Sequence, residues 1–405
     1  MGETFKSLAT TLAVQMLGSM ALLTVPVLAP AAARDVGVPA AYVGLYIALA
    51  YGASMLASLA CGDLIRRLGA IRVSQLCLLL CAIASLLAAG GTLGFFAASA
   101  VFMGLGYGPM TPASSHVLAR TTSPQAMSLV FSVKQTGVPL GGVAAGALVP
   151  ALVIAASWRG ALGVVAAACV LVALAAQPLR ESLDGDREPG RRIHFGSLAG
   201  PLRVVLTTPD VRRLAFMSFV YSSLQLCLVT YLVTYLTGSL GYSLVQAGFM
   251  MSAAQAAGVV SRIGWGALAD RTRKPVGVLA FLGGGMAVGA LATGAFDASW
   301  PPVLVAVACA WFGATAISWN GVYLAEVARR APAGRAVEAT GGSLAFTYFG
   351  VLVSPPLFGL AAEHGAGFGL AYAGLALPAV ACAGWLWLSH RSARRRVQLE
   401  ESLSS

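Results

Sequence analysis

The chain has 405 residues, of which 58% are hydrophobic and only 10% are charged. A water-soluble globular protein carries about 25% charged residues, so this composition excludes a soluble fold. Because a spanning helix needs about 20 mostly apolar residues, the length accommodates about twelve spans and no sizeable soluble domain. The seven cysteines all fall within apolar stretches, so we interpret them as core residues and expect neither a disulfide nor a metal site.

Twelve apolar runs, separated by charged residues or by Pro and Gly, predict twelve transmembrane helices in an all-α membrane protein. In chain order they occupy residues 8–33, 40–65, 71–93, 95–119, 126–156, 158–178, 212–238, 243–268, 275–296, 301–328, 336–362 and 366–389. The first run is longer than the 7–15 residues of a signal-peptide core, so we expect an uncleaved first helix.

The longest hydrophilic stretch follows the sixth span and divides the chain into halves of equal span number. We predict an N-terminal six-helix bundle at 1–178, a cytoplasmic linker at 179–211, a C-terminal six-helix bundle at 212–390 and a basic cytoplasmic tail at 391–405. These ranges contain short loops throughout, which are typical of a protein of the bacterial inner membrane.

The distribution of basic residues predicts the orientation of the chain. Of the 26 Lys and Arg residues, 22 lie in the two termini and in alternate loops, whereas only Arg34 and Arg159 lie in the other loops. Because Lys and Arg accumulate on the cytoplasmic side, both termini are predicted to be cytoplasmic. The net charge of +11 then mostly reflects the orientation of the chain in the membrane, and it does not indicate a nucleic-acid partner.

The two halves contain weakly similar segments. Gly62–Gly69 after the second span is similar to Gly266–Lys274 after the eighth, and Pro139–Gly142 is similar to Pro356–Gly359; the offsets are 204 and 217 residues. One duplicated six-helix unit is typical of transporters whose site lies near the midplane, between the halves.

These motifs resemble those of the major facilitator superfamily over essentially the whole chain. The resemblance implies two pseudo-symmetric six-helix bundles that move by a rocker-switch mechanism, with the loop motif locking neighbouring helices in the outward-facing state. Arg66 stands where the family has an Asp, and Ala100 stands where the family's proton-linked motif has an Arg. By resemblance, the candidate gating residues are Gly62, Arg66, Arg67, Gly266, Asp270, Arg271 and Arg273.

Two further cations, Lys134 and Arg262, lie inside spans. At 1.5 Å per residue they lie about 15 Å and about 12 Å from the cytoplasmic ends of the fifth and eighth spans. In the resembled architecture these helices face each other, so both cations would point into one cavity. Since no carboxylate is placed to neutralise them, an anionic ligand is expected there. Snorkelling to the interface, or pairing with helix C-terminal carbonyls, is the alternative.

The spacing from Arg262 to Gly266 also resembles the eighth helix of monocarboxylate and oxalate/formate carriers, where this Arg binds or couples to the substrate carboxylate. Lys134 departs from those families, because their partner lysine is on a different helix. Polar and aromatic residues at similar depth complete the candidate binding site: Gln255, Asn320, Gln225, Tyr107, Tyr348, Trp319 and Gln15.

The sequence therefore predicts a secondary active transporter of a small organic anion, a mono- or dicarboxylate, that is proton-coupled or exchanges anions. Its expected partners are the anionic solute, H+ and the lipid bilayer, and we expect a monomer without a cofactor. An exporter of neutral or amphipathic drugs or metabolites is the alternative, followed by a membrane sensor or a lipid flippase. An enzyme is not expected, because the sequence has no metal cluster, nucleophile elbow or phosphate loop.

Overall fold

The computed structural model describes residues 2–122, 127–190, 199–332, 335–365 and 367–404. All regular structure in these ranges is helical, as predicted. The elements are α1 (Gly2–Val36), η1 (Ala40–Tyr42), α2 (Val43–Leu68), α3 (Ala70–Ala88), α4 (Leu93–Tyr107), α5 (Met110–Thr121), α6 (Met127–Gln135), α7 (Gly137–Ala175), η2 (Gln177–Leu179), α8 (Arg180–Leu183), α9 (Ala199–Thr207), α10 (Pro209–Ser239), α11 (Leu244–Thr272), α12 (Pro275–Gly294), α13 (Pro302–Ala316), α14 (Asn320–Arg330), α15 (Ala336–His364) and α16 (Gly367–Ser404).

The described residues contain eleven segments long and apolar enough to cross a membrane. One of them, Val133–Leu183, has 51 residues and changes direction inside α7 at Ser157, whose φ is 72°. The indole of Trp158 donates to Asp35 at the end of α1, whereas Gln177 accepts from Gln75 of α3. This segment therefore crosses twice, and the predicted all-α, multi-span membrane fold is confirmed.

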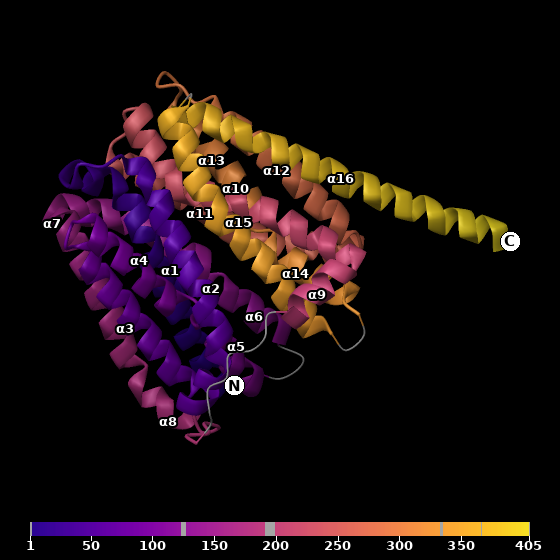
Figure 1. Ribbon diagram of the computed structural model, residues 1–405, viewed down its shortest axis with the longest axis horizontal. Helices are drawn as coiled ribbons and strands as arrows, with labels where there is room; N and C mark the ends of the chain where they lie inside the picture. The colour runs from indigo at the N-terminus through magenta and orange to yellow at the C-terminus, as the bar shows by residue number, and fades with distance from the viewer. Residues whose placement is uncertain (1, 123–126, 191–198, 333–334, 366, 405) are drawn as a thin grey trace.

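The helices form two groups that lie side by side, α1–α8 and α9–α16, and the yellow α16 runs past the rest of the bundle (Figure 1). We call one end of the bundle the basic end, because α2, α11 and α14 finish there with Arg66, Arg271 and Arg329. The opposite end contains the C-terminus of α1 and the short helix η1.

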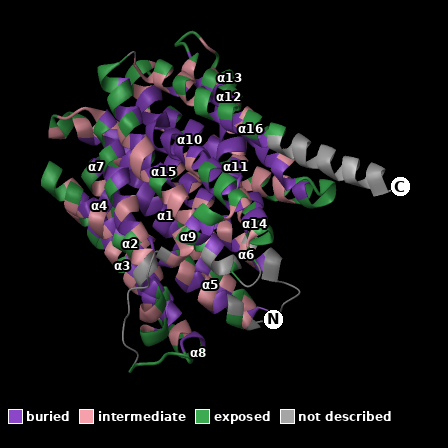
Figure 2. Ribbon diagram, turned by 45° about the vertical axis from the view of Figure 1, so that its right-hand side comes forward, coloured by how far each residue is buried: buried purple, intermediate pink, exposed green. Residues whose placement is uncertain are grey.

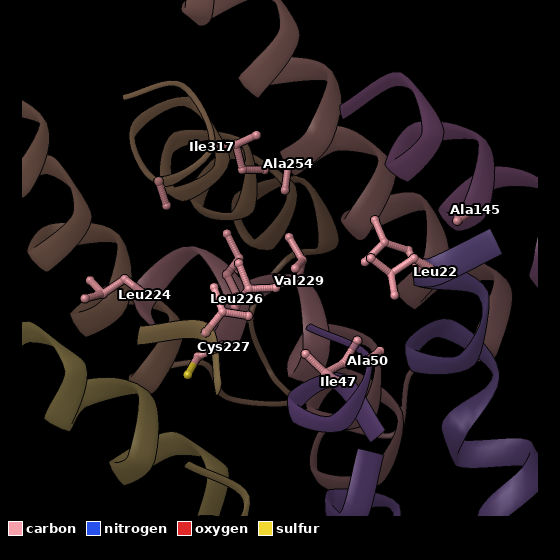
Figure 3. Close-up of a cluster of buried hydrophobic side chains, with 14 of the residues drawn as sticks. Leu22, Ile47, Ala50, Ala145, Leu224, Leu226, Cys227, Val229, Ala254 and Ile317 are labelled. Carbon is pink, nitrogen blue, oxygen red and sulfur yellow. The ribbon is translucent and has the colours of Figure 1, made fainter. Parts of the chain in front are cut away.

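Large apolar side chains are found both inside the bundle and on its perimeter. Leu171, Leu377 and Val303 are among the exposed ones, and exposed residues line the outside of the helices in Figure 2. Hydrocarbon, unlike water, solvates such side chains without cost. Inside, Leu22 and Ile47 of the first group gather with Leu226 and Val229 of α10 (Figure 3), so one core joins the two groups.

The two groups meet closely toward the opposite end, along contacts that we call the seam. In the α7–α11 contact, a Cβ added at Gly146 or Gly248 would overlap the backbone of the other helix. Where η1 meets α15, the Tyr231 hydroxyl of α10 lies 2.9 Å from the Ala41 carbonyl oxygen and 2.6 Å from that of Pro355. Glycine allows this close backbone approach because it has no side chain.

The basic end is more open than the seam. Among the described residues, the extensive contacts of α5, α6 and α8 are with helices of the first group, and those of α9 and α14 are with helices of the second. The bundle is therefore closed at the opposite end and separated at the basic end.

Candidate functional site

Three spans are interrupted near mid-depth. The fourth breaks at Gly108–Pro109, between α4 and α5, and the tenth at residues 317–319, between α13 and α14. The fifth breaks at Thr136, between α6 and α7. The last residues of α4 and α13, Tyr107 and Ala316, are 209 residues apart, which agrees with the offsets of the sequence repeat. In transporters, discontinuous helices of this kind expose backbone groups around the binding site.

Lys134 lies just before the break in the fifth span and is only 1% exposed. Its ammonium group donates to the side-chain oxygen of Gln135 at 3.3 Å. Within the described ranges, no carboxylate forms an ion pair with it. Burying an unpaired ammonium costs several kcal/mol of desolvation free energy after relaxation. Lys134 therefore destabilises the protein in the absence of a ligand.

Arg262 of α11 contacts both groups of helices. Its Nη1 donates to the Gln135 carbonyl oxygen at 3.0 Å and its Nη2 to the Ile317 carbonyl oxygen at 2.7 Å. Gln135 ends α6, and Ile317 follows α13, so both oxygens lack a helical donor and carry the negative end of a helix dipole. The Nε–H of Arg262 is buried without a partner among the described residues. One alternative left open by the sequence was that the cation pairs with carbonyls at helix C-termini. Arg262 forms this pairing.

Gln135 is the residue that brings the two cations together. Its amide oxygen accepts from Lys134 and its backbone oxygen accepts from Arg262. Gln135 is not among the residues selected from the sequence, although an amide next to a mid-span lysine is a usable signal. Lys134 and Arg262 therefore both lie at the break in the fifth span.

Four of the predicted polar residues line the breaks. Gln225 of α10 accepts from the Trp319 indole at 3.0 Å and from the Asn320 amide at 3.4 Å, beside the break in the tenth span. Gln15 of α1 accepts from Thr111 at 3.0 Å, just after the break in the fourth span. These contacts hold the broken segments against the neighbouring helices of the same group.

The predicted tyrosines come from both groups, Tyr107 from α4 and Tyr348 from α15. Tyr107 ends α4, and its ring lies edge to face with that of Tyr51, with 6.1 Å between centroids. It is also close enough to Tyr348 of α15 and to Arg262 for electrostatic interaction. Gln255, by contrast, packs against Gly142 in the seam, away from these contacts.

The residues selected as gating candidates lie at the basic end of the bundle. Asp270, Arg271 and Arg273 are exposed, and so are Arg66 and Arg67. In the part of the chain that the structure describes, the side chains of Asp270, Arg271 and Arg273 form no ion pair. A Cβ added at Gly62 or Gly266 would meet nothing within 4 Å. This is consistent with the separation of the two groups at this end.

A carboxylate from the linker occupies the loop between α2 and α3, where Arg66 replaces the expected Asp. Asp184 accepts from the backbone N–H groups of Ile71 at 2.8 Å and Arg72 at 3.0 Å, and so caps α3, which begins after Gly69 and has no capping side chain of its own. Burial raises the pKa of Asp184, although these two N–H groups act in the other direction.

Asp186 extends this attachment to α5, and we call Asp184 and Asp186 together the linker clasp. Asp186 pairs with Arg120 and, at 2.6 Å, with His116. Burial acts to raise the pKa of Asp186, but the hydrogen bonds from Arg120 and His116 outweigh it and hold the pKa below its ordinary value. His116 is thereby engaged at the basic end, away from the helix breaks.

The family model described as the Major Facilitator Superfamily matches residues 8–355. This chain belongs to that superfamily. It is therefore a secondary transporter that works by alternating access, and not an enzyme. No curated protein sequence matches it significantly.

Solved structures of several transporters share the fold. A bacterial homolog of the human lysosomal transporter Spinster, in an inward-facing and occupied conformation, aligns with a TM-score of 0.75 at 15% identity, covering 96% of this chain and 97% of that one. The nucleoside transporter NupG gives 0.74 at 14%, covering 94% and 99%. A POT family transporter in complex with 5-aminolevulinic acid gives 0.76 at 12%, covering 95% and 96%. At these identities the matches establish the fold alone.

Proposed function

We propose that this transporter carries a small organic anion, a mono- or dicarboxylate, and that Lys134 and Arg262 bind it. The observation that carries the proposal is the convergence of the two cations on Gln135, with Lys134 1% exposed and without a carboxylate partner among the described residues. A ligand that brings negative charge would offset the burial cost that the protein otherwise bears.

The donors at this site suit a carboxylate. The Lys134 ammonium has three N–H donors, of which one is used by Gln135, and the Nε–H of Arg262 is unused. A carboxylate accepts well from an ammonium and from a guanidinium at once, since both are charge-assisted donors. The helix-8 resemblance to monocarboxylate and oxalate/formate carriers supports the same chemistry for Arg262.

The orientation is part of the proposal. If the basic end faces the cytoplasm of a bacterium, as the distribution of Lys and Arg favours, the separated end of the bundle opens inward. Coupling to H+ would pass through Lys134 or through the substrate. Anion exchange would need no proton.

A neutral or amphipathic solute is the second candidate, and one observation favours it. Tyr51, Tyr107 and Tyr348 present aromatic surface to the same region, which suits a ligand bound by stacking and a few hydrogen bonds. In that case, Lys134 and Arg262 would serve the helix breaks only.

The test is the thermal stability of the purified protein in the presence of acetate, lactate, oxalate, malonate, phosphate, amines and neutral drugs. A ligand at about 100 times its Kd stabilises the folded state by about 2.7 kcal/mol, which is visible as a higher Tm. We expect a carboxylate to raise the Tm of the wild type, and Lys134→Gln and Arg262→Gln each to abolish the shift.

Lys274→Gln is the matched control, because it removes a cation that is exposed at the basic end. It should leave the carboxylate shift unchanged. A Tm that rises only with amines, or a carboxylate shift that survives both substitutions, would reject the anion site at Lys134 and Arg262. A Tm that rises only with neutral amphiphiles would reject it in favour of the second candidate.

A further inference from the structure

An apolar groove lies at the opposite end of the first group, between α1, α2 and α4, and none of its lining residues belongs to the helix breaks. Its volume is about 230 Å³, many times the roughly 10–15 Å³ that one water molecule needs. The floor includes buried Leu28 and Val43, and the rim includes exposed Leu45, Leu49 and Leu93. Because all lining residues are apolar or aromatic, water inside the groove would lack polar partners.

The groove opens on the apolar perimeter of the bundle. Leu45, Leu49 and Leu56 are exposed and share one face of α2, and on α4 Leu93 and Ala97 are exposed one turn apart. In a membrane, such a surface is in contact with acyl chains. A void beside them would deprive the lining atoms of dispersion contacts on one side. Hydrocarbon from the bilayer is therefore the ligand that fits this groove.

The groove has the length of one leaflet. Its lining residues on α1 run from Val25 to Val36, which at 1.5 Å per residue is about 16 Å. The hydrocarbon core of a bilayer is about 30 Å thick, so one leaflet contributes about 15 Å. The Trp158 ring stacks on Phe96 of the groove, with 6.2 Å between centroids, and Trp is enriched at the level of the headgroups. An acyl chain along α1 would thus have its headgroup near the C-terminus of this helix.

A cation lies at that end of the groove. Arg34 is exposed in the last turn of α1, next to the lining residue Ala33. Its Nε–H donates to the Pro30 carbonyl oxygen at 3.2 Å, and its Nη groups have no hydrogen-bond partner among the described residues. The neighbouring Asp35 forms its ion pair with Arg159 instead, at 3.1 Å. A guanidinium whose terminal N–H groups are unused can bind a phosphate.

We propose that this groove binds one acyl chain of a bilayer phospholipid and that Arg34 binds the phosphate of the same molecule. The lining holds the chain, the length of the groove places the phosphate at the end of α1, and the Nη groups supply its donors. The site is separate from the proposed anion site and does not depend on it. It adjoins the seam, because Tyr42 lines the groove while the Ala41 carbonyl oxygen accepts from Tyr231. A bound chain therefore packs against η1, which helps to close the opposite end.

The first experiment maps the position of an acyl chain on the full-length protein. The protein is reconstituted into liposomes that contain phosphatidylglycerol with a photoactivatable diazirine in one acyl chain, and cross-linked peptides are identified by mass spectrometry. We expect cross-links to be enriched several-fold in residues 25–49 and 93–97 relative to the exposed apolar face of α16 around Leu377. Ala97→Trp adds bulk at an exposed lining position and should remove the enrichment, whereas Ala361→Trp, at an exposed position of α15 outside the groove, should retain it.

The second experiment tests the phosphate contact. Native mass spectrometry counts the lipids that the purified protein retains from phosphatidylglycerol and from a diacylglycerol with the same chains but no phosphate. The wild type should retain one phosphatidylglycerol, and Arg34→Gln should retain it about tenfold less, because a hydrogen bond to a charged group contributes about that factor. The diacylglycerol should bind the wild type as weakly. Lys274→Gln, which removes an exposed cation at the basic end, should equal the wild type.

Thermal unfolding verifies that each variant is folded, and the cross-linking of the wild type needs no groove variant at all. Even cross-linking around the whole perimeter would reject the groove as a lipid site, and so would an enrichment that persists in a folded Ala97→Trp protein. Equal retention of phosphatidylglycerol by the wild type and Arg34→Gln, or of phosphatidylglycerol and diacylglycerol by the wild type, would reject the phosphate contact. None of these results depends on whether the protein carries a carboxylate.

Discussion

The two groups of helices are connected in different ways at the seam and at the helix breaks. In the seam toward the opposite end, backbone touches backbone at Gly146 and Gly248, and Tyr231 bonds to carbonyls of η1 and α15. At the helix breaks, by contrast, the guanidinium of Arg262 forms a direct polar connection between the two groups. Close packing of small residues depends on shape, whereas a guanidinium can exchange one oxygen ligand for another. The seam is thus suited to keep the opposite end closed, whereas the Arg262 contact is suited to respond to an anion.

The largest effect is expected from bulk added to the seam. In Gly248→Val, the new side chain would overlap the Gly146 carbonyl oxygen and the Pro150 ring. Overpacking of this kind costs about 1–3 kcal/mol, so the seam should open. The distance between spin labels on Arg67→Cys and Ala328→Cys, two exposed positions at the basic end, should then shorten.

Gly264→Val on the same helix is the control, because a Cβ there meets nothing within 4 Å. It should leave both the Tm and the distance distribution close to those of the wild type. Equal effects of the two substitutions would mean that the seam does not hold the observed state.

A smaller effect is expected from Tyr231→Phe, which removes the hydroxyl contacts at 2.9 Å and 2.6 Å but keeps the ring. A net hydrogen bond contributes about 0.5–1.5 kcal/mol, so the closed opposite end should lose a few-fold in population. Accessibility of a cysteine placed at exposed Tyr42 to a membrane-impermeant maleimide measures this. An unchanged labelling rate would show that packing alone closes that end.

The smallest effect concerns the linker clasp and pH. Because the pKa of Asp186 in the folded protein lies below its ordinary value, its pairing stabilises the fold at neutral pH, and this contribution disappears as the pH falls through the lowered pKa. The Tm difference between the wild type and Asp186→Asn should therefore be positive at pH 7 and shrink toward zero below about pH 4.

Burial raises the pKa of Asp184, so this group changes the stability of the wild type with pH in the opposite direction. The contribution of Asp186 is therefore measured as the Tm difference between the wild type and Asp186→Asn at each pH. The control is Glu363→Gln, which replaces an exposed carboxylate at the C-terminal end of α15. A Tm difference for Asp186→Asn that does not change with pH would contradict the role of its charge.

The features predicted correctly from sequence are those that depend on local composition. Apolar runs locate the spans, the superfamily motifs point to the fold, and the depth of Lys134 and Arg262 follows from counting residues along a helix. The shared depth also predicts their proximity, since both are measured from the same end.

The features that sequence did not give depend on partners distant in the chain. No Pro marks the break at residues 317–319, which is held by Arg262 from α11 and by Gln225 from α10. Likewise, the capping of α3 by Asp184 joins residues more than 110 positions apart. The missing acid at Arg66 could be noticed in the sequence, but its replacement by a linker carboxylate could not.

The central claim is that Lys134 and Arg262 form an anion site, and flux measures this most directly. Wild-type protein and Lys134→Met are reconstituted into proteoliposomes, and uptake of labelled lactate and oxalate is measured by counterflow. Replacing a buried, unpaired cation by an apolar side chain of similar length should raise the Tm. The account predicts carboxylate counterflow by the wild type, and a Lys134→Met protein that is more stable yet at least tenfold slower. Equal counterflow by a well-folded Lys134→Met would contradict it.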